Sequence, residues 1–338
     1  PPTPTVNSAA LPRVTAVVAT LLLTATAAVA DSARLGLPVM GTVLQIEVVA
    51  SDRSTAATLC RRALETARTY DDLLTTWRTE GELARLNQQA GQGQIKISRP
   101  LHTALSRMLE LSAATAGAFD PSVGRAVEFW RDSASDGPAP NASPGRGLAE
   151  RLALGTRAEA SEGLQYWAAL AGGVRLDAGG IGKGMALDAI VAMLRNGGAT
   201  AAFLDFGGSS QLGFGVPDKG GEWTVALPSL AGVAGTVTLG DRAISTSLAS
   251  TAGSAAGPII DPASMRPVAM PRLATVIGSD ATSAEAWSTA LVVLGRQGLA
   301  RAARAGVDAV FEDGSGRTRS GRTAGLKQGG LDGAEQNH

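Results

Sequence analysis

Residues 176–188 read LDAGGIGKGMALD and contain the most informative turn in the chain. An expected strand ends at Asp177, a turn with closely spaced glycines follows, and a helix begins near Lys183. Backbone N–H groups at a helix N-terminus, with a lysine beside them, suit a phosphate or a pyrophosphate. The turn matches neither the Walker pattern nor the GxGxxG fingerprint. A tight strand-to-helix turn that needs glycines for positive φ is therefore an equally open interpretation.

The segments on either side of this turn mix helices and strands without regular βαβ alternation. That pattern favours an α+β fold, with helices and largely antiparallel sheets in a single domain. Hydrophobic periodicity predicts helices over residues 55–86, 102–116, 182–196 and 283–305, and strands over residues 43–48, 173–176, 201–206, 273–277 and 307–311, with hairpins between 216 and 244 and a loop over 132–147.

Composition excludes several classes of function. The chain carries 30 basic and 30 acidic residues, so its net charge gives no footprint for a nucleic-acid partner. Hydrophobic residues make up 44% of the chain, which is enough for a sizeable core. Cys60 is the only cysteine, which excludes an internal disulfide and a cysteine-based metal site. Its helical surroundings predict a small core residue.

The two ends of the chain differ in composition from the rest. Arg13 precedes an apolar or small run over residues 14–29, and the run closes in Ala28-Val29-Ala30. This pattern predicts a signal peptide over residues 1–30 and an exported, periplasmic or extracytoplasmic protein. An uncleaved membrane anchor is the alternative. Residues 313–338 contain few large apolar side chains and are expected to be disordered, which leaves a single domain over residues 31–312.

Two further segments suggest ligand contacts. In residues 201–215, AAFLDFGGSSQLGFG, a buried strand runs into two glycines that either let backbone approach a flat ring or form a plain hairpin. In residues 284–295, AEAWSTALVVLG, Glu285 and Thr289 are four apart and share one face of a helix. A carboxylate and a hydroxyl on one face suit Mg²⁺, a hard cation that prefers oxygen ligands. A capped or exposed first helical turn is the alternative interpretation.

Eight motifs in a consistent order, between residues 39 and 295, give the chain a family resemblance. They are VMGT (39–42), TTWRTEGELARLN (75–87), GAFDPSVG (117–124), LDAGGIGKG (176–184), FLDFGGSSQLGFG (203–215), STS (245–247), IIDP (259–262) and AEAWSTALVVLG (284–295). Together they resemble the FAD:protein FMN transferases, or ApbE-type flavin transferases. The resemblance implies magnesium-dependent transfer of the FMN moiety of FAD to a Ser or Thr hydroxyl of an acceptor redox protein, with release of AMP.

The same resemblance implies roles for individual residues. The implied FAD contacts are Met40, Trp77, Ala118, Phe119, Asp120, Asp177, Lys183 and Ile259. Met40 and Trp77 would contact the flavin, and Lys183 would face the pyrophosphate. The implied magnesium ligands are the backbone carbonyl near Gly180, the side chains of Glu285 and Thr289, and also Ser288. Acceptors of this family belong to membrane-bound or extracytoplasmic redox proteins, in keeping with export.

The chain also departs from the family pattern. Glu285 stands where the family usually has Asp, and Pro258 stands where it has a His just before IIDP. A histidine acid or base at that position is therefore absent, and Asp261 is the candidate substitute base. These departures leave two alternatives open: a FAD pyrophosphatase that gives FMN and AMP, and a catalytically weak FAD-binding protein.

Overall fold

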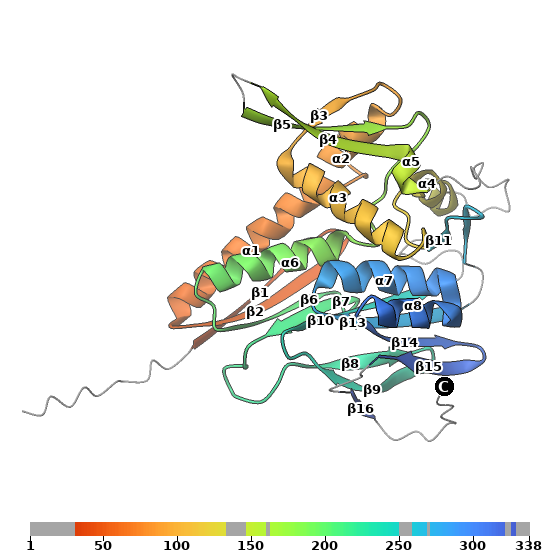
Figure 1. The fold of residues 1–338 in the computed structure, drawn as a ribbon. Coiled ribbons are helices and arrows are strands. Elements are labelled where there is room, and N and C mark those ends of the chain that lie inside the picture. The colour runs from red at the N-terminus through yellow and green to blue at the C-terminus, as the bar shows by residue number, and fades with distance from the viewer. Residues whose placement is uncertain are drawn as a thin grey trace, which may run out of the picture.

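The computed structural model describes residues 31–132, 147–159, 163–249, 259–268, 271–321 and 326–328. Its centre is an eight-stranded sheet with helices packed on one face (Figure 1). A small sheet packs on the opposite face, and a second small sheet lies beyond the helices (Figure 1). The predicted signal peptide and most of the predicted loop over 132–147 lie outside the described residues.

The central sheet is antiparallel throughout. In spatial order its strands are β1 (Asp31–Val39), β2 (Thr42–Ala50), β6 (Ala201–Phe206), β7 (Ser210–Phe214), β10 (Arg242–Ala249), β13 (Arg272–Gly278), β14 (Asp308–Asp313) and β15 (Gly316–Ser320). A two-residue turn joins β1 to β2, with φ of 52° at Met40 and 74° at Gly41. Positive φ at both positions matches the twist of a tight hairpin. The predicted α+β class with antiparallel sheets is confirmed.

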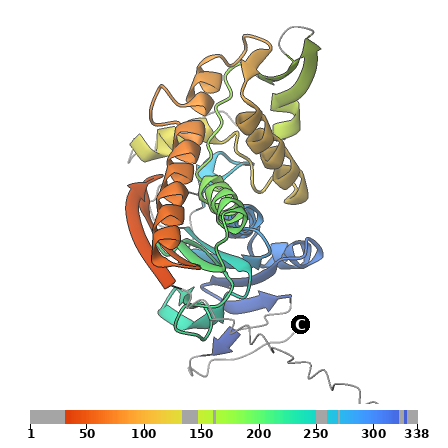
Figure 2. The same cartoon turned by 90° about the vertical axis from the view of Figure 1, so that its left-hand side faces the viewer.

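The helices on the central sheet are α1 (Arg53–Leu74), α6 (Gly182–Asn196), α7 (Ala281–Leu294) and α8 (Leu299–Arg304), with a short 3₁₀ turn over Gly295–Gly298. Figure 2 shows α6 between α1 and α7, and it packs against both. Trp287 of α7 is almost fully buried, which places α7 at the centre of the main core.

Two long helices predicted from periodicity are each interrupted. The helix expected over residues 55–86 stops at Thr75, and α2 (Glu82–Gln88) begins after Gly81. A Cβ at Gly81 would lie 2.5 Å from the Thr75 side chain, so the chain doubles back where only glycine fits. The helix expected over residues 283–305 is broken at Gly295, whose φ of 67° is left-handed and ends α7.

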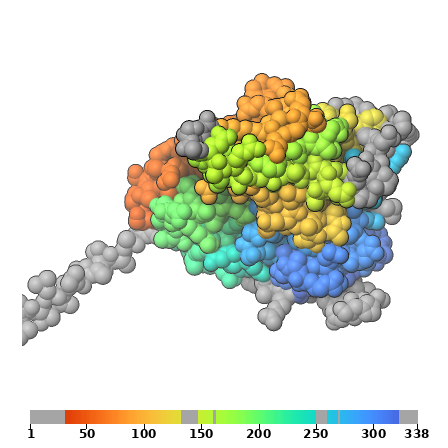
Figure 3. All heavy atoms as spheres, turned by 45° about the horizontal axis from the view of Figure 1, so that its top comes forward, coloured from red at the N-terminus to blue at the C-terminus, as the bar shows by residue number. Residues whose placement is uncertain are grey.

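A lobe of the described residues 82–132, 147–159 and 163–170 lies over the helices (Figure 3). It contains a sheet of β3 (Ile95–Ile97), β5 (Gly163–Leu170) and β4 (Leu152–Glu159), with the helices α2, α3 (Arg99–Ala114), α4 (Gly124–Asp132) and α5 (Leu148–Arg151). None of these three strands was expected from the sequence. The strand expected over residues 173–176 is reduced to one bridge, between Arg175 and Val123.

The remaining strands are short. β8 (Thr224–Ser229), β9 (Gly232–Thr238) and β16 (Leu326–Gln328) form the sheet on the far face of the central sheet. Val225, Leu227 and Val237 pack there against Ile244 and Val310. β11 (Ile260–Asp261) and β12 (Arg266–Pro267) form a separate hairpin.

The tail predicted to be disordered from Asp313 contains β15 and β16 among its described residues, so that prediction is wrong for residues 313–321 and 326–328. Polar contacts replace the missing apolar ones. Arg317 forms an ion pair with Glu312 across the hairpin, and Arg296 binds Asp313 and the Thr318 hydroxyl.

Within the described part of the chain, no helix is long and apolar enough to cross a membrane.

Candidate functional site

The glycine-rich turn lies at the crossing of α6 and α7. A Cβ at Gly184 would come within 2.4 Å of the Ala281 carbonyl oxygen, so a side chain there would separate the two helices. Gly179, Gly180, Gly182 and Gly184 all have negative φ. The interpretation that these glycines supply positive φ is therefore wrong. Gly184 is needed for a different reason, because the backbone of α7 passes too close to leave room for a side chain.

Each of the two crossing helices offers a carboxylate to the first turn of the other. Glu285 of α7 accepts a hydrogen bond from the Gly184 N–H of α6 at 2.6 Å. Asp188 of α6 accepts from the N–H groups of Ala281 and Thr282 in α7, at 2.8 and 2.9 Å. The first N–H groups of a helix have no partner within it and carry partial positive charge, so both contacts are favourable.

Glu285 is 3% exposed and is held by more than the helix. Lys183 Nζ lies 2.5 Å from its Oε1, and the Ser210 hydroxyl donates to the same oxygen at 3.5 Å. Glu285 is the fifth residue of α7, whose N-cap is Asp280, so the alternative of a capped or exposed first turn does not apply to it. The ion pair satisfies a charge that would be costly to bury alone.

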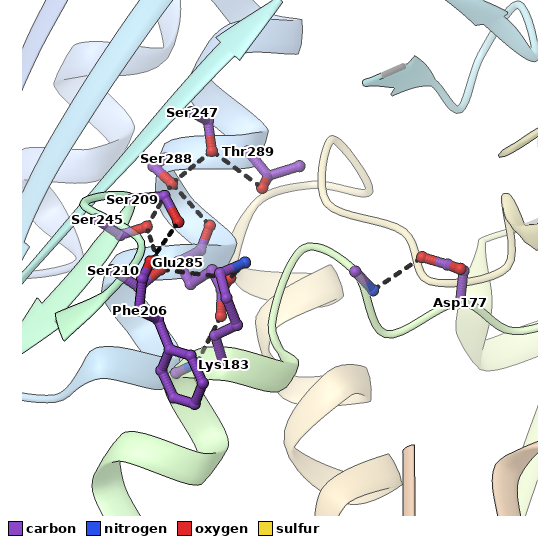
Figure 4. A network of polar contacts seen from close by, with 12 residues as sticks. Asp177, Lys183, Phe206, Ser209, Ser210, Ser245, Ser247, Glu285, Ser288 and Thr289 are labelled. Carbon is purple, nitrogen blue, oxygen red and sulfur yellow. Dashed lines mark hydrogen bonds and ion pairs between the residues drawn. The ribbon is translucent and has the colours of Figure 1, made fainter. Parts of the chain in front are cut away.

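A series of hydroxyl groups continues from Glu285 along the face between β10 and α7 (Figure 4). Ser210 Oγ and Ser245 Oγ are 3.5 Å apart, and Ser245 Oγ and Ser288 Oγ are 3.2 Å apart. Ser247 Oγ lies 2.8 Å from Ser288 Oγ and 3.4 Å from Thr289 Oγ1. Ser210, Ser245 and Ser288 are buried, and Ser247 and Thr289 are half-buried at the end of the series.

Two of the four predicted magnesium ligands, Gly180 and Thr289, lie next to each other. A Cβ at Gly180 would lie 3.1 Å from Thr289 Oγ1, which places that backbone beside the hydroxyl. Thr289 is one helical turn beyond Glu285 on α7. Ser288 differs, because it has no exposed surface and faces the other hydroxyls.

The donors at this site are oxygen atoms of one carboxylate, hydroxyls and a carbonyl, which suits a hard cation such as Mg²⁺. Among the described residues there is no group of three or more His, Cys, Asp or Glu side chains that could hold a metal. The donor set fits magnesium only if hydroxyl and carbonyl oxygens, or oxygens of a bound phosphate, complete the coordination.

The residues expected to contact the flavin lie in three different segments. Met40 sits in the β1–β2 turn. Its Cε lies 3.2 Å from the position that a Cβ on Gly182 would occupy. Trp77 lies between α1 and α2 and is 70% exposed. The guanidinium carbon of Arg131, on α4, lies 3.5 Å from the Trp77 ring centroid, so one face of the indole is covered.

The GAFDPSVG motif is buried beside the glycine-rich turn. Ala118, Phe119 and Asp120 are each less than 8% exposed, and the Asp120 carboxylate accepts from the Ser122 N–H at 2.8 Å. Asp177 accepts from the Gly179 N–H at 2.8 Å and is not linked to the hydroxyl series (Figure 4).

The IIDP motif forms part of the β11–β12 hairpin. Ile259 is partly buried against the main core. Asp261 accepts from the Ala263 N–H at 2.9 Å and from the Ser264 hydroxyl at 3.0 Å, so its carboxylate holds the turn of the hairpin. Pro258, which replaces the family's histidine, lies outside the described residues.

Sequence reasoning missed four polar residues of this region, namely Asp188, Ser210, Ser245 and Ser247. The two serines of the STS motif alternate along β10, so the period of a strand places both on the face toward α7. Burial raises the pKa of Asp188 and its hydrogen bonds with Thr282 and Ala281 oppose that rise, as expected for a carboxylate inside a helix crossing.

The fold and the site define an α+β protein whose polar cluster is built on the facing N-termini of two buried helices. The chain belongs to the ApbE family, whose family model matches residues 40–311. The resemblance inferred from the eight motifs is thereby confirmed.

Individual proteins are similar over most of the chain. A Klebsiella pneumoniae (strain 342) protein named FAD:protein FMN transferase is 27% identical over 291 residues, which are 80% of this chain and 86% of the relative. A Rhodobacter capsulatus protein of the same name is 32% identical over 251 residues, which are 70% of this chain and 47% of the relative.

Solved structures share the fold. Flavin transferase ApbE from Vibrio cholerae superposes with a TM-score of 0.69 at 23% identity, covering 86% of this chain and 97% of that one. The apo form of flavinyl transferase ApbE from Pseudomonas stutzeri gives a TM-score of 0.70 at 22% identity, covering 86% and 95%.

Proposed function

We propose that this protein transfers the FMN moiety of FAD to a Ser or Thr hydroxyl of an acceptor redox protein, with Mg²⁺ as cofactor and AMP as product. The observation that carries the proposal is the combination of Lys183, Glu285 and Thr289 around the first turn of α6. The name shared by the relatives, FAD:protein FMN transferase, supports the same activity.

The first turn of α6 supplies the phosphate side of the site. Its glycines leave the backbone bare of side chains, and the helix N-terminus carries partial positive charge. Lys183 adds a full positive charge at the same place and keeps 21% of its side chain exposed. The Gly182 and Gly184 N–H groups are already bonded, to the Ala178 carbonyl and to the Glu285 carboxylate. A pyrophosphate bound there would be held mainly by the ammonium group of Lys183.

Magnesium would be held by Glu285, Thr289 and the Gly180 carbonyl together with phosphate oxygens. When bound, Mg²⁺ neutralises negative charge that develops on the pyrophosphate as its bridging bond breaks. Lys183 shares one Glu285 oxygen with this proposed site, at 2.5 Å. Lys183 would face the phosphates with its ammonium group from this position.

The transfer requires one bond to form and one to break. The acceptor hydroxyl oxygen bonds to the FMN phosphorus, the P–O bond to the AMP half breaks, and AMP leaves with the bridging oxygen. The hydroxyl proton passes to a base. Asp261 is the candidate in this chain. Each of its carboxylate oxygens accepts one hydrogen bond in the hairpin turn and keeps a lone pair for a proton.

The flavin ring would pack between Met40 and the exposed indole of Trp77. Arg131 covers one face of that indole. The flavin ring would therefore either stack on the other face of the indole or displace the guanidinium group of Arg131. The buried GAFDPSVG segment beside Gly180 would shape the neighbouring wall, with Phe119 3.5 Å from the position of a Gly180 Cβ.

We also propose that the protein acts outside the cytoplasm. The support is the apolar run over residues 14–29 and the small-residue site that closes it. An exported enzyme would meet acceptors that face the same compartment, either soluble or membrane-bound.

The test is AMP release from FAD by the purified chain, with Mg²⁺ or EDTA, in the presence or absence of an acceptor domain containing a Ser or Thr flavinylation site. The proposal expects metal-dependent AMP release and covalent flavin fluorescence on the acceptor. AMP release without an acceptor would instead identify a FAD pyrophosphatase. Bound FAD with no AMP under any condition would identify a binding protein and overturn the proposal.

A further inference from the structure

Ser288 is the neighbour of Thr289 on α7, and its hydroxyl is buried among three protein oxygens. Its hydroxyl donates to the Glu285 backbone carbonyl at 2.9 Å. A hydroxyl group has one proton and two lone pairs. Ser288 therefore only accepts from its other neighbours, Ser245 at 3.2 Å and Ser247 at 2.8 Å. The buried Ser288 hydroxyl is therefore surrounded by protein groups rather than facing the proposed metal site.

This arrangement fixes the direction of the next hydrogen bond. Two hydroxyl oxygens 2.8 Å apart are at the usual distance of a hydrogen bond and need a proton between them. Because the Ser288 proton is directed at the Glu285 carbonyl, the proton between Ser247 and Ser288 belongs to Ser247. Ser247 then has only lone pairs to offer Thr289.

Thr289 is consequently the donor in its contact with Ser247, across 3.4 Å. That distance is longer than the 2.5–3.0 Å of a strong bond between hydroxyls, so the contact orients the Thr289 proton without fixing it rigidly. With its proton directed inward toward Ser247, Thr289 Oγ1 turns its lone pairs toward Gly180.

We propose that Ser247 and Ser288 are positioning residues that turn the lone pairs of Thr289 toward a bound divalent cation. The inference rests on the proposed function, in which Thr289 is a magnesium ligand. A cation is attracted by an oxygen lone pair and repelled by a hydroxyl proton. Partners that orient a metal ligand in this way commonly change metal affinity by about 10–100-fold when they are removed.

The chain provides a matched control in Ser245. Ser245 is a serine of the same strand, is 3% exposed, and its Oγ lies 3.2 Å from Ser288 Oγ. It does not lie between Thr289 and the Glu285 carbonyl, so its loss leaves the Thr289–Ser247–Ser288 series intact. Ser245→Ala removes a buried hydroxyl of the same kind without reorienting Thr289.

The experiment measures Mn²⁺ affinity by titration, with electron paramagnetic resonance of free Mn²⁺, on the full chain saturated with FAD. The proteins are the unmodified chain, Ser247→Ala, Ser247→Thr, Ser245→Ala and Thr289→Ala. FAD affinity in EDTA and the thermal midpoint are measured for each. The expected result is Mn²⁺ binding about tenfold weaker in Ser247→Ala, restored in Ser247→Thr and unchanged in Ser245→Ala, with FAD affinity in EDTA unchanged.

Two results would overturn the inference while leaving the proposed function standing. One is weaker Mn²⁺ binding in Thr289→Ala but not in Ser247→Ala. The other is an equal loss in Ser247→Ala and Ser245→Ala, which would indicate a general effect of buried hydroxyls. If the unmodified chain with FAD binds no Mn²⁺, or Thr289→Ala binds it normally, the inference and the proposed magnesium site both fail.

Discussion

Asp188 and Glu285 occupy equivalent places at the two sides of the α6–α7 crossing, and their surroundings differ. Asp188 accepts from two backbone N–H groups and the Thr282 hydroxyl, all on α7. Glu285 accepts from one backbone N–H group and two side chains, Lys183 and Ser210, from different elements. Backbone donors at a helix end are fixed, whereas a lysine and a serine side chain can rotate away.

This difference separates a structural carboxylate from one suited to ligand exchange. The pKa of Asp188 is raised mainly by burial, and the neighbouring Asp280 charge raises it further. Glu285 is paired with Lys183, whose side chain is 21% exposed, and in the proposed function a metal ion takes the place of that lysine. We therefore expect changes at Glu285 to affect activity and changes at Asp188 to affect stability.

The largest effect is expected from Glu285→Gln. The glutamine keeps an oxygen for the Gly184 N–H but loses the negative charge that the proposed cation needs. Metal-dependent AMP release from FAD should fall by at least about a hundredfold, equivalent to about 3 kcal/mol of transition-state stabilisation. The measurement is kcat/KM for AMP release, with urea unfolding of the same preparation.

Glu285→Asp is the matched control, because it keeps the negative charge and introduces the aspartate that flavin transferases usually have at this position. It should retain most of the activity. Unchanged turnover in Glu285→Gln would contradict the assignment of this carboxylate to the metal.

Asp188→Ala is expected to act on stability. It leaves the first N–H groups of α7 and the Thr282 hydroxyl without their acceptor, and the free energy of unfolding should fall by about 2–4 kcal/mol. Urea unfolding measures the loss, and Mn²⁺ affinity of the folded fraction should not change.

Asp280→Ala is the comparison variant on the same helix. Asp280 caps α7 from a more exposed position, so its loss should cost only about 1 kcal/mol. A loss of metal affinity in Asp188→Ala at unchanged stability would remove the distinction between the two carboxylates.

The smallest effect is a pH dependence. Because the folded-state pKa of Asp188 is raised above its ordinary value of about 3.9, the folded state binds this proton more readily than the unfolded state. This preference adds to the free energy of unfolding. The contribution is fully present below the pKa that Asp188 has in the unfolded state, and it is lost as the pH rises through its pKa in the folded state. The free energy of unfolding, relative to Asp188→Asn, should be higher near pH 4 than near pH 7. A difference that is flat or rises with pH would show that burial does not dominate at Asp188.

Much of the fold could be predicted from local patterns, and the exceptions have identifiable causes. The predicted helix over residues 182–196 matches α6, and the predicted strand over residues 201–206 matches β6. β4 and β5 were missed because their side chains are mostly half-exposed, so neither strand has a clear apolar alternation. β15 was missed because ion pairs, rather than apolar contacts, hold it.

The candidate site was predictable in its motifs but not in its internal contacts. Spacing on a helix placed Glu285 and Thr289 together, the glycine-rich turn indicated Lys183, and the family resemblance added Gly180. The ion pair between Lys183 and Glu285 depends on how α6 crosses α7, which no local pattern encodes. The roles of Ser247 and Ser288 depend in addition on which hydroxyl donates, and that direction follows from the Ser288 contact with the Glu285 carbonyl, which only accepts.

The crossing of α6 and α7 also determines when the site comes into existence during synthesis. Gly184 and Glu285 are 101 residues apart in the sequence, and Asp188 and Ala281 are 93 apart. Contacts between such distant residues form late, because a long loop must close first. A nascent chain that has not yet extended past α7 lacks both reciprocal contacts. It can neither hold the α6 turn in place nor present the carboxylate, so flavin and metal would meet a binding site only when nearly the whole domain has been made.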